Sequence, residues 1–177
     1  MGLDFEEYAR GAQRRLYRTA YLLCGDPENA RDLTQSTLAR LFQYWHRASR
    51  ADNVDAYACT VLTRLYLTER RRGLRTLLAH RRIDPAPAPE RPELRVTLLA
   101  ALAGLPPRAR AMVVLRYWDD LSVETVAGLL GCSASTVKSQ CSRALGRLRE
   151  QLGEGDSWSG RGAAGQPRNR CGGRAEG

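Results

Sequence analysis

Residues 121–149, LSVETVAGLLGCSASTVKSQCSRALGRLR, predict two short helices joined by a tight turn. Apolar residues recur at helical spacing on both sides of Gly131, where a left-handed backbone would end the first helix at little cost. Ser122 and Ser133 stand where the two helices would begin, and each can accept a hydrogen bond from a free amide group. The pattern is typical of a helix-turn-helix, which places its second helix in the DNA major groove.

The second of these helices would have a polar face opposite its buried stripe. Hydroxyl groups there can bond phosphates or base edges, and cations add an attraction that does not depend on the DNA sequence. A simple helical hairpin with a solvated polar face remains the alternative, but the turn and the hydroxyl-rich second helix occur together and favour DNA binding. The exposed face would carry Ser135, Thr136, Lys138, Ser139, Arg143 and Arg147.

The whole chain is basic. Its 177 residues carry 28 Lys and Arg side chains and 19 Asp and Glu side chains, which gives a net charge of +9 and a pI near 9.9. The positive excess is spread along the chain and is not gathered in one arm. A charge balance of this kind suits an anionic partner such as nucleic acid.

The cysteines and histidines do not predict a catalytic or metal site. The chain has five cysteines, an odd number, without C-x-x-C spacing, and its two histidines, His46 and His80, belong to no ligand cluster. Buried reduced thiols therefore fit better than a disulfide framework or a zinc site. An enzyme would have to pair Cys59 with one of these histidines, and no group that would orient a base accompanies them. We expect no enzyme, no cofactor and no metal.

The sequence gives no signal for export or membrane insertion. No apolar run reaches 18 residues, and the chain opens on the acidic stretch MGLDFEE. These features predict a soluble cytoplasmic protein.

Helical spacing predicts three helices in the first part of the chain, over about residues 5–23, 27–46 and 54–72. Asp26 can cap the second helix, and Pro27 suits its first position because that amide has no helical partner. A polar stretch over residues 47–53 separates the second helix from the third.

Residues 73–92 predict a linker. They end in DPAPAPERP, where alternating prolines exclude a helix and favour an extended, hydrated chain. Helical patterns resume over about residues 93–103 and 107–118 and lead into the helix-turn-helix. Residues 153–177 are rich in Gly, Arg, Ser and Ala and are expected to be disordered.

The sequence thus predicts an all-α protein of two small helical domains, residues 4–72 and 93–152, joined by a flexible linker. Domains of this size are expected to share little interface. The flexible linker would let the two domains bind two sites whose separation is fixed by another molecule.

Several stretches, taken together and in order, resemble a bacterial RNA polymerase sigma factor of the extracytoplasmic-function group, within its actinobacterial sigma-E-type subgroup. DFEEY (4–8) and TAYLLCGD (19–26) are similar to the start of sigma region 2, and ARDLTQSTLARLF (30–42) is similar to the segment that grips the polymerase. LPPRAR (105–110), RYWDDLS (116–122) and the helix-turn-helix resemble sigma region 4. The resemblance covers about residues 4–152 and implies a three-helix region 2 domain and a region 4 domain.

The resemblance also implies a function without chemistry in this chain. Region 2 would dock on a coiled coil of the polymerase core and open the −10 element of the promoter, while region 4 would place its second helix in the −35 element and rest on the polymerase flap. The partners would be the core enzyme and promoter DNA, and an anti-sigma factor is a further candidate. The alternative is a stand-alone helix-turn-helix regulator, which would require a dimer for which no helix is evident.

Carried over residue by residue, the resemblance assigns three sets of contacts. The polymerase-binding set is Asp32, Gln35, Leu38 and Phe42. The −10 set is Asn53, Arg64, Arg70, Arg71 and Arg72. The −35 set is Ser133, Ser135, Thr136, Lys138, Ser139, Gln140, Arg143 and Arg147.

Simpler interpretations stay open for some of these positions. Leu38 is as well explained as a core residue, and Tyr57, which could stack on a −10 base, fits the core better. The arginines at 70–72 could be a solvated helix end favoured by the helix dipole. The chain also departs from the family pattern at Ser36, where an acidic residue is common, and at Gln140, where a cation is common and an amide could bond adenine.

Overall fold

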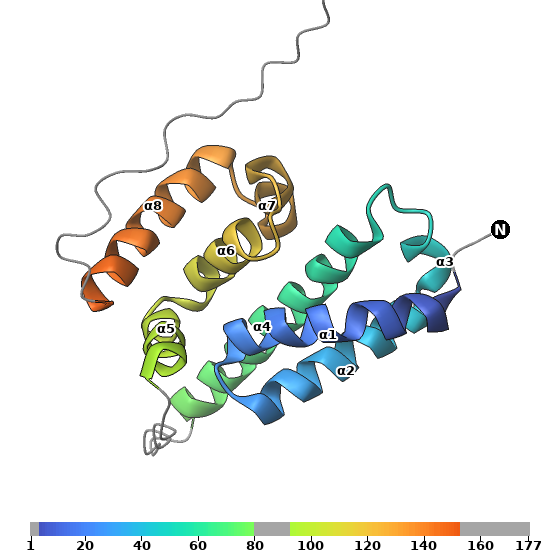
Figure 1. Cartoon of the computed structure of the whole chain (residues 1–177), viewed down its shortest axis with the longest axis horizontal. Coiled ribbons are helices and arrows are strands. Elements are labelled where there is room, and N and C mark those ends of the chain that lie inside the picture. The colour runs from blue at the N-terminus through green and yellow to red at the C-terminus, as the bar shows by residue number, and fades with distance from the viewer. Residues whose placement is uncertain (1–3, 80–92, 153–177) are drawn as a thin grey trace, which may run out of the picture.

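The computed structural model describes residues 4–79 and 93–152, with side chains for residues 4–73 and 98–152. Within these ranges every regular element is a helix, so the prediction of an all-α fold is confirmed. The expected disorder of residues 153–177 and most of the expected linker lie outside the described residues. Figure 1 shows the helices as two groups that lie side by side.

The N-terminal domain, residues 4–79, is built from three long helices and one short one. Helices α1 and α2 lie against each other, and both pack on α4 (Figure 1). Its core is made of fully buried leucines that recur at helical spacing, including Leu16, Leu23, Leu33 and Leu62. The helices are α1 (Phe5–Cys24), α2 (Pro27–Gln43), α3 (Trp45–Ala48) and α4 (Val54–Ala79).

The turn between α1 and α2 is formed by the residues that the sequence indicated. Gly25 adopts a left-handed backbone with φ 76°, and its amide donates to the Tyr21 carbonyl. The Asp26 carboxylate accepts from the amide of Asn29 at 2.8 Å, so the predicted cap of α2 is confirmed. A tight turn of this kind sets α2 antiparallel to α1.

The C-terminal domain, residues 93–152, contains the predicted helix-turn-helix. Ser122 accepts from the Thr125 amide at 3.0 Å, and Ser133 accepts from the Thr136 amide at 3.1 Å. Gly131 ends α7 with φ 61°, a backbone that favours glycine. The helices are α5 (Glu93–Ala103), α6 (Pro107–Tyr117), α7 (Val123–Leu130) and α8 (Ala134–Gln151).

Two helix ends differ from the prediction. The second helix ends at Gln43 and not near residue 46, because Tyr44 leaves the helical conformation (φ −117°, ψ 25°) and a short α3 follows. This break lets the Trp45 ring pack against Phe5 and Tyr8, with ring centroids 5.3 and 5.2 Å apart. The sequence around Trp45 does not indicate these contacts, because the partner rings are distant in the chain.

The third long helix runs further than predicted. The linker was expected to begin at Gly73, but α4 continues to Ala79. A glycine inside a helix costs only about 1 kcal/mol relative to alanine. The residues that follow, LRTLLA, are good helix formers, and the first proline that excludes a helix comes at Pro85.

The expectation that the two domains share little interface is wrong. Helix α1 contacts α5 and α6, and α4 contacts α6. Arg110 of α6 is only 3% exposed, and its Nη1 donates to the Leu23 carbonyl at the end of α1 at 2.7 Å. Its Nη2 donates to the Ala103 carbonyl, also at 2.7 Å. The guanidinium thus bonds the carbonyl ends of one helix from each domain.

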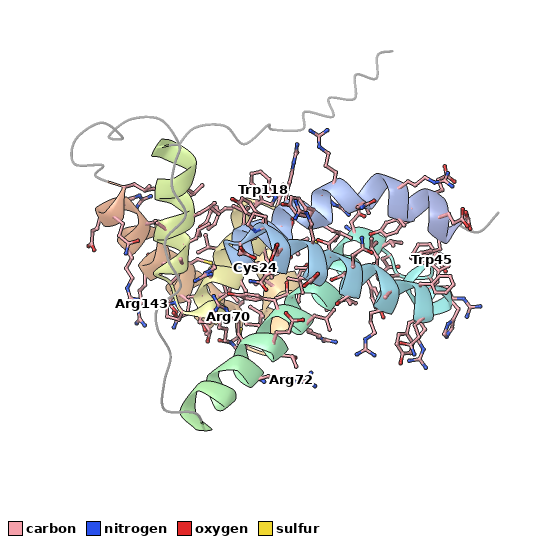
Figure 2. All side chains as sticks on the ribbon, turned by 90° about the horizontal axis from the view of Figure 1, so that it is seen from below. Cys24, Trp45, Arg70, Arg72, Trp118 and Arg143 are labelled. Atoms are coloured by element: carbon pink, nitrogen blue, oxygen red, sulfur yellow. The ribbon has the colours of Figure 1, made fainter. Side chains whose placement is uncertain are left out.

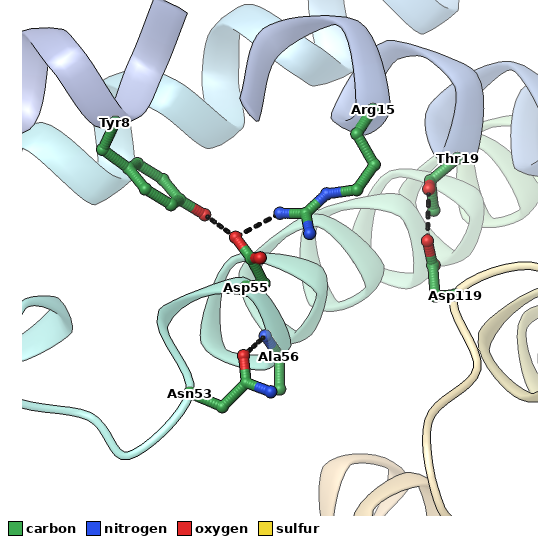
Figure 3. Close-up of polar contacts among 7 residues, drawn as sticks. All are labelled: Tyr8, Arg15, Thr19, Asn53, Asp55, Ala56 and Asp119. Carbon is green, nitrogen blue, oxygen red and sulfur yellow. Dashed lines mark hydrogen bonds and ion pairs between the residues drawn. The ribbon is translucent and has the colours of Figure 1, made fainter. Parts of the chain in front are cut away.

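A second polar bridge and an apolar contact complete the interface. Thr19 of α1 donates its hydroxyl to the Asp119 carboxylate at 2.8 Å, across the gap between the domains (Figure 3). Cys59 of α4 is buried in the same cluster as Met112 and Leu115 of α6. The described residues therefore form one packed body.

Candidate nucleic-acid interface

Helix α8 presents the predicted DNA-facing residues on an exposed face. Val137 and Cys141 are buried and fix the helix against α6 and α7. Figure 2 shows Arg143 on α8 at the opposite end of the molecule from Trp45. The exposed members of the set are Ser133, Ser135, Lys138, Ser139, Arg143 and Arg147, while Thr136 and Gln140 are half-buried.

The hydroxyl groups at the start of α8 bond one another. The Ser133 Oγ lies 2.9 Å from the Ser135 Oγ and 2.8 Å from the Thr136 Oγ1, and the Ser139 hydroxyl donates to the Thr136 carbonyl at 3.1 Å. A hydroxyl has one donor and two acceptor positions, so these side chains keep capacity for a phosphate or a base edge. Their mutual hydrogen bonds fix their positions on the first turn of α8.

Sequence reasoning missed a groove beside this face. It has a volume of about 330 Å³, and Lys138 and Ser142 of α8 line it together with Arg116 and Tyr117 of α6. Tyr117 is 57% exposed, and the Arg116 guanidinium lies 5.8 Å from its ring centroid. The sequence signal for this groove was Arg116 beside Tyr117, a cation and an aromatic residue at the end of α6.

The residues expected to meet the −10 element lie along α4 and do not converge. The Asn53 Oδ1 caps α4 by accepting from the Ala56 amide at 2.9 Å, which leaves the Nδ2 group for a base edge (Figure 3). Arg64 is exposed and lies about 16 Å further along the helix at 1.5 Å per residue. Arg70 and Arg72 follow on the exposed part of α4 (Figure 2), with Arg71 between them. Because Arg70, Arg71 and Arg72 are consecutive, they point in different directions around α4, and these cations are spread over the helix and not gathered at one point.

Two aromatic side chains on α4 have structural roles. Tyr57 is half-buried and packs against the core of the N-terminal domain, as the simpler interpretation expected. Tyr66 is buried, and the Arg70 guanidinium lies 5.8 Å from its ring centroid. Arg70 is therefore partly held by a cation–π contact.

A polar cluster that the sequence did not reveal fixes the start of α4 on α1. Asp55 accepts hydrogen bonds from the Arg15 guanidinium and, at 3.0 Å, from the Tyr8 hydroxyl (Figure 3). The hydrogen bond from Arg15 is the main reason that the pKa of Asp55 is lowered. Burial, with Asp55 nearby, raises the pKa of Tyr8. Asn53 is thereby placed beside a carboxylate that stays ionised.

Replacing Asp55 with asparagine should lower the free energy of unfolding at neutral pH. Because the pKa of Asp55 is lowered by folding, its ionised form stabilises the protein above the ordinary carboxyl range near 3.9, and this contribution is lost as the pH falls through the lowered pKa. We expect the difference between wild type and Asp55→Asn in urea unfolding to be largest near pH 7 and to narrow toward pH 3. A difference that stayed constant with pH would contradict this role for Asp55.

The residues expected to bind polymerase lie on α2. Asp32 and Gln35 are exposed, and Phe42 is 67% exposed although it is a large apolar side chain. The Phe42 ring contacts Phe5 with centroids 5.1 Å apart. Leu38 is half-buried and packs on the core, so part of its surface belongs to the fold. An exposed phenylalanine beside polar groups is suited to docking on another protein.

The thiols of Cys24 and Cys59 are not activated nucleophiles. Burial raises the pKa of Cys24 to about 11 and that of Cys59 to about 12, so both stay protonated near neutral pH. Across residues 4–79 and 93–152, no group of three His, Cys, Asp or Glu side chains could hold a metal ion. No helix in those ranges is both long and apolar enough to cross a membrane.

Comparison with known proteins matches both domains. The family model for sigma-70 region 2 covers residues 9–76, and that for sigma-70 region 4 covers residues 95–148. The chain is 38% identical to the RNA polymerase sigma-E factor of Streptomyces coelicolor over 161 residues, which span 85% of this chain and 86% of that one. It is 34% identical to the ECF RNA polymerase sigma factor SigE of Mycolicibacterium smegmatis, over 87% of this chain and 63% of that one.

A solved structure shares the arrangement of the helices. The sigma factor RpoE of Bartonella quintana, solved with the anti-sigma factor NepR, is similar with a TM-score of 0.75 and 25% identity. The similarity covers 85% of this chain and 98% of that one.

A region 2 domain followed by a helix-turn-helix region 4 domain defines an RNA polymerase sigma factor. The chain belongs to the sigma-70 family, and its relatives are sigma-E and extracytoplasmic-function factors. It therefore binds the polymerase core and directs transcription initiation at promoters. Because region 2 is matched as well as the helix-turn-helix, the alternative of a stand-alone regulator is not supported.

Proposed function

We propose that this sigma factor divides its work among three surfaces. The exposed face of α2, with Asp32, Gln35 and Phe42, binds the polymerase core, and α8 enters the major groove of the −35 element. Helix α4, from Asn53 to Arg72, follows the opened −10 strand. The observation that carries this proposal is that the described candidate side chains are mostly exposed, while the opposite faces of the same helices are buried.

The contacts on DNA would differ in kind. Lys138, Arg143 and Arg147 supply charge to phosphates, whereas Ser135, Ser139 and Gln140 supply hydrogen-bonding groups for base edges. On α4, exposed arginines spaced along one helix suit the backbone of a single strand. The protein contributes binding and no catalytic group, so the chemistry of RNA synthesis belongs to the polymerase.

The two domains must separate before both promoter elements are bound. The −10 and −35 elements lie about 25 base pairs apart, which is roughly 85 Å along B-DNA at 3.4 Å per base pair. Two domains that touch through Arg110 and Thr19 do not span that distance. We infer a closed resting form that opens on the polymerase.

An anti-sigma factor is a fitting partner for the closed form. The Bartonella quintana sigma factor that this chain resembles over 85% of its length was solved with its anti-sigma factor. A partner that binds the closed form better than the open one would shift the population toward it. Such control would operate in the cytoplasm, where the polymerase is found.

Promoter selection with reconstituted holoenzyme tests the proposal. Core polymerase with this chain should retain a set of genomic fragments that share two short elements at constant spacing, and core polymerase alone should not. The chain without polymerase should retain few of them, because four cations from Leu121 to Arg149 give weak, salt-sensitive binding. Equal selection with and without polymerase would overturn the proposal.

A further inference from the structure

A polar cleft lies where the loop between α6 and α7 meets the N-terminal domain. It has a volume of about 360 Å³, and Arg15 and Arg18 of α1 line it together with the start of α4 and residues 118–121 of the loop. The loop is tied to α6, because the Asp119 amide donates to the Val114 carbonyl at 3.1 Å. The loop therefore carries a carboxylate, that of Asp119, into the interface between the domains.

Only one oxygen of the Asp119 carboxylate has a strong hydrogen-bond donor in this cleft. The Oδ1 atom accepts from the Thr19 hydroxyl at 2.8 Å, and Thr19 is fully buried (Figure 3). The Oδ2 atom is also buried and has no hydrogen-bond partner among the described residues. An ionised carboxylate accepts hydrogen bonds on both oxygens, and burying a charge without partners costs far more than burying a neutral group. The closed form therefore favours the protonated carboxyl group.

The groups around Asp119 do not neutralise its charge. Arg15 attracts the Asp119 carboxylate but donates its hydrogen bond to Asp55, and no described cation lies within ion-pair distance of Asp119. The Cys59 thiol also faces the carboxylate, and a thiol is a weak donor. The titratable and charged groups that face Asp119 come from α1, α4 and the loop itself, and they are Arg15, Arg18, Asp55, Cys59 and Asp120.

The pKa of Asp119 differs between the closed and the open form. Burial raises this pKa in the closed form, although the Thr19 hydroxyl and the charge of Arg15 act in the opposite direction. In the open form the N-terminal domain no longer covers the loop, so the pKa returns to the ordinary carboxyl value of about 3.9. Protonated Asp119 then stabilises the closed form fully below the ordinary pKa, and this contribution is lost as the pH rises through the raised pKa. The ratio of open to closed form therefore rises with pH.

We propose that Asp119 couples closure of the two domains to the uptake of one proton, which makes the α6–α7 loop a pH-sensitive contact. The neutral carboxyl group is accommodated in the cleft, whereas the ionised carboxylate is more stable in water. A rise in pH would thus make more of the chain available in the open form. The inference rests on the closed resting form that belongs to the proposed function, and it adds the group that controls its opening.

Small-angle X-ray scattering of the free chain across a pH series from about 4 to about 8 tests the coupling. The radius of gyration of wild type should increase with pH, and the ratio of open to closed form should rise by at most about tenfold per pH unit, because one proton is involved. Asp119→Asn is neutral at every pH and keeps an acceptor for Thr19, so it should stay compact throughout.

Asp120→Asn is the matched control for this experiment. Asp120 is exposed in the same loop, and its replacement makes the same change in net charge. Its backbone has φ 51°, a conformation that asparagine tolerates. The radius of gyration of Asp120→Asn should therefore follow that of wild type at each pH.

Other outcomes would overturn the inference in distinguishable ways. A compact wild type whose radius of gyration does not change with pH, or an equal change in Asp119→Asn, would overturn the proton coupling and leave the proposed function intact. A wild type that is extended at every pH would overturn the closed resting form as well. Carbon-13 NMR of the Asp119 carboxyl group gives a local readout, and a titration midpoint at the ordinary value of about 3.9 would also overturn the inference. Far-UV circular dichroism at each pH establishes that the proteins stay folded.

Discussion

Replacing Arg110 with methionine is expected to separate the two domains while each stays helical. The Arg110 guanidinium donates to the buried Leu23 carbonyl and to the part-buried Ala103 carbonyl, and a methionine would remove both donors. Hydrogen bonds to a charged group contribute about 1.5–3 kcal/mol each. Opening the interface lets water bond to the Leu23 carbonyl. The substitution therefore destabilises the closed form more than the open form.

Small-angle X-ray scattering should detect the change as a larger radius of gyration at unchanged helical content. Arg147→Met is the matched control, because Arg147 is exposed on α8, a helix that packs mainly on α5, α6 and α7. Thr19→Val, a change in the N-terminal domain, removes the hydrogen bond to Asp119. It should increase the radius of gyration less than Arg110→Met does. An Arg110→Met protein as compact and as stable as wild type would contradict the role given to this arginine.

Replacing Lys138 and Arg143 together with alanine should weaken promoter binding by the holoenzyme and make it less dependent on salt. Each phosphate contact contributes about 0.9 to the slope of log affinity against log salt, so losing two should reduce the slope by about 1.8. Transcription from promoters that depend on the −35 element should fall by about tenfold at physiological salt. Filter binding across a salt series measures the slope directly.

Charge-preserving substitutions show whether weaker promoter binding comes from the lost charges or from a disturbed fold. Lys138→Arg with Arg143→Lys keeps both cations on the exposed face and should keep the slope of wild type. If the alanine variant also kept that slope, α8 would not be the helix that meets the phosphates.

Local signals in the sequence were enough for the helix-turn-helix. Ser122, Gly131 and Ser133 act within three or four residues of their partners, and each was predicted correctly because its chemistry is local. The same holds for Asp26 at the start of α2. The residues that the family resemblance assigned to the −35 element also lie mostly on an exposed face, although their contacts with DNA remain predictions.

Features that depend on distant residues could not be predicted. The bonds from Arg110 to Leu23 and from Thr19 to Asp119 join residues 87 and 100 positions apart. Nothing in the sequence around Arg110 indicates which distant residue it contacts. For Asn53 the sequence could not separate two roles, because one side chain can cap a helix and also face a base. The end of α2 at Gln43 was missed because Trp45 turns toward aromatic rings of α1.

Retention on immobilised core polymerase, measured without DNA, tests the division between the α2 surface and the α8 surface most directly. Three proteins are compared: wild type, Asp32→Ala/Gln35→Ala, and Lys138→Ala/Arg143→Ala. The α2 variant should lose about tenfold or more in affinity, as expected for truncated interface side chains, while the α8 variant should be retained like wild type. The same loss of retention in both variants, or no loss in the α2 variant, would contradict the account.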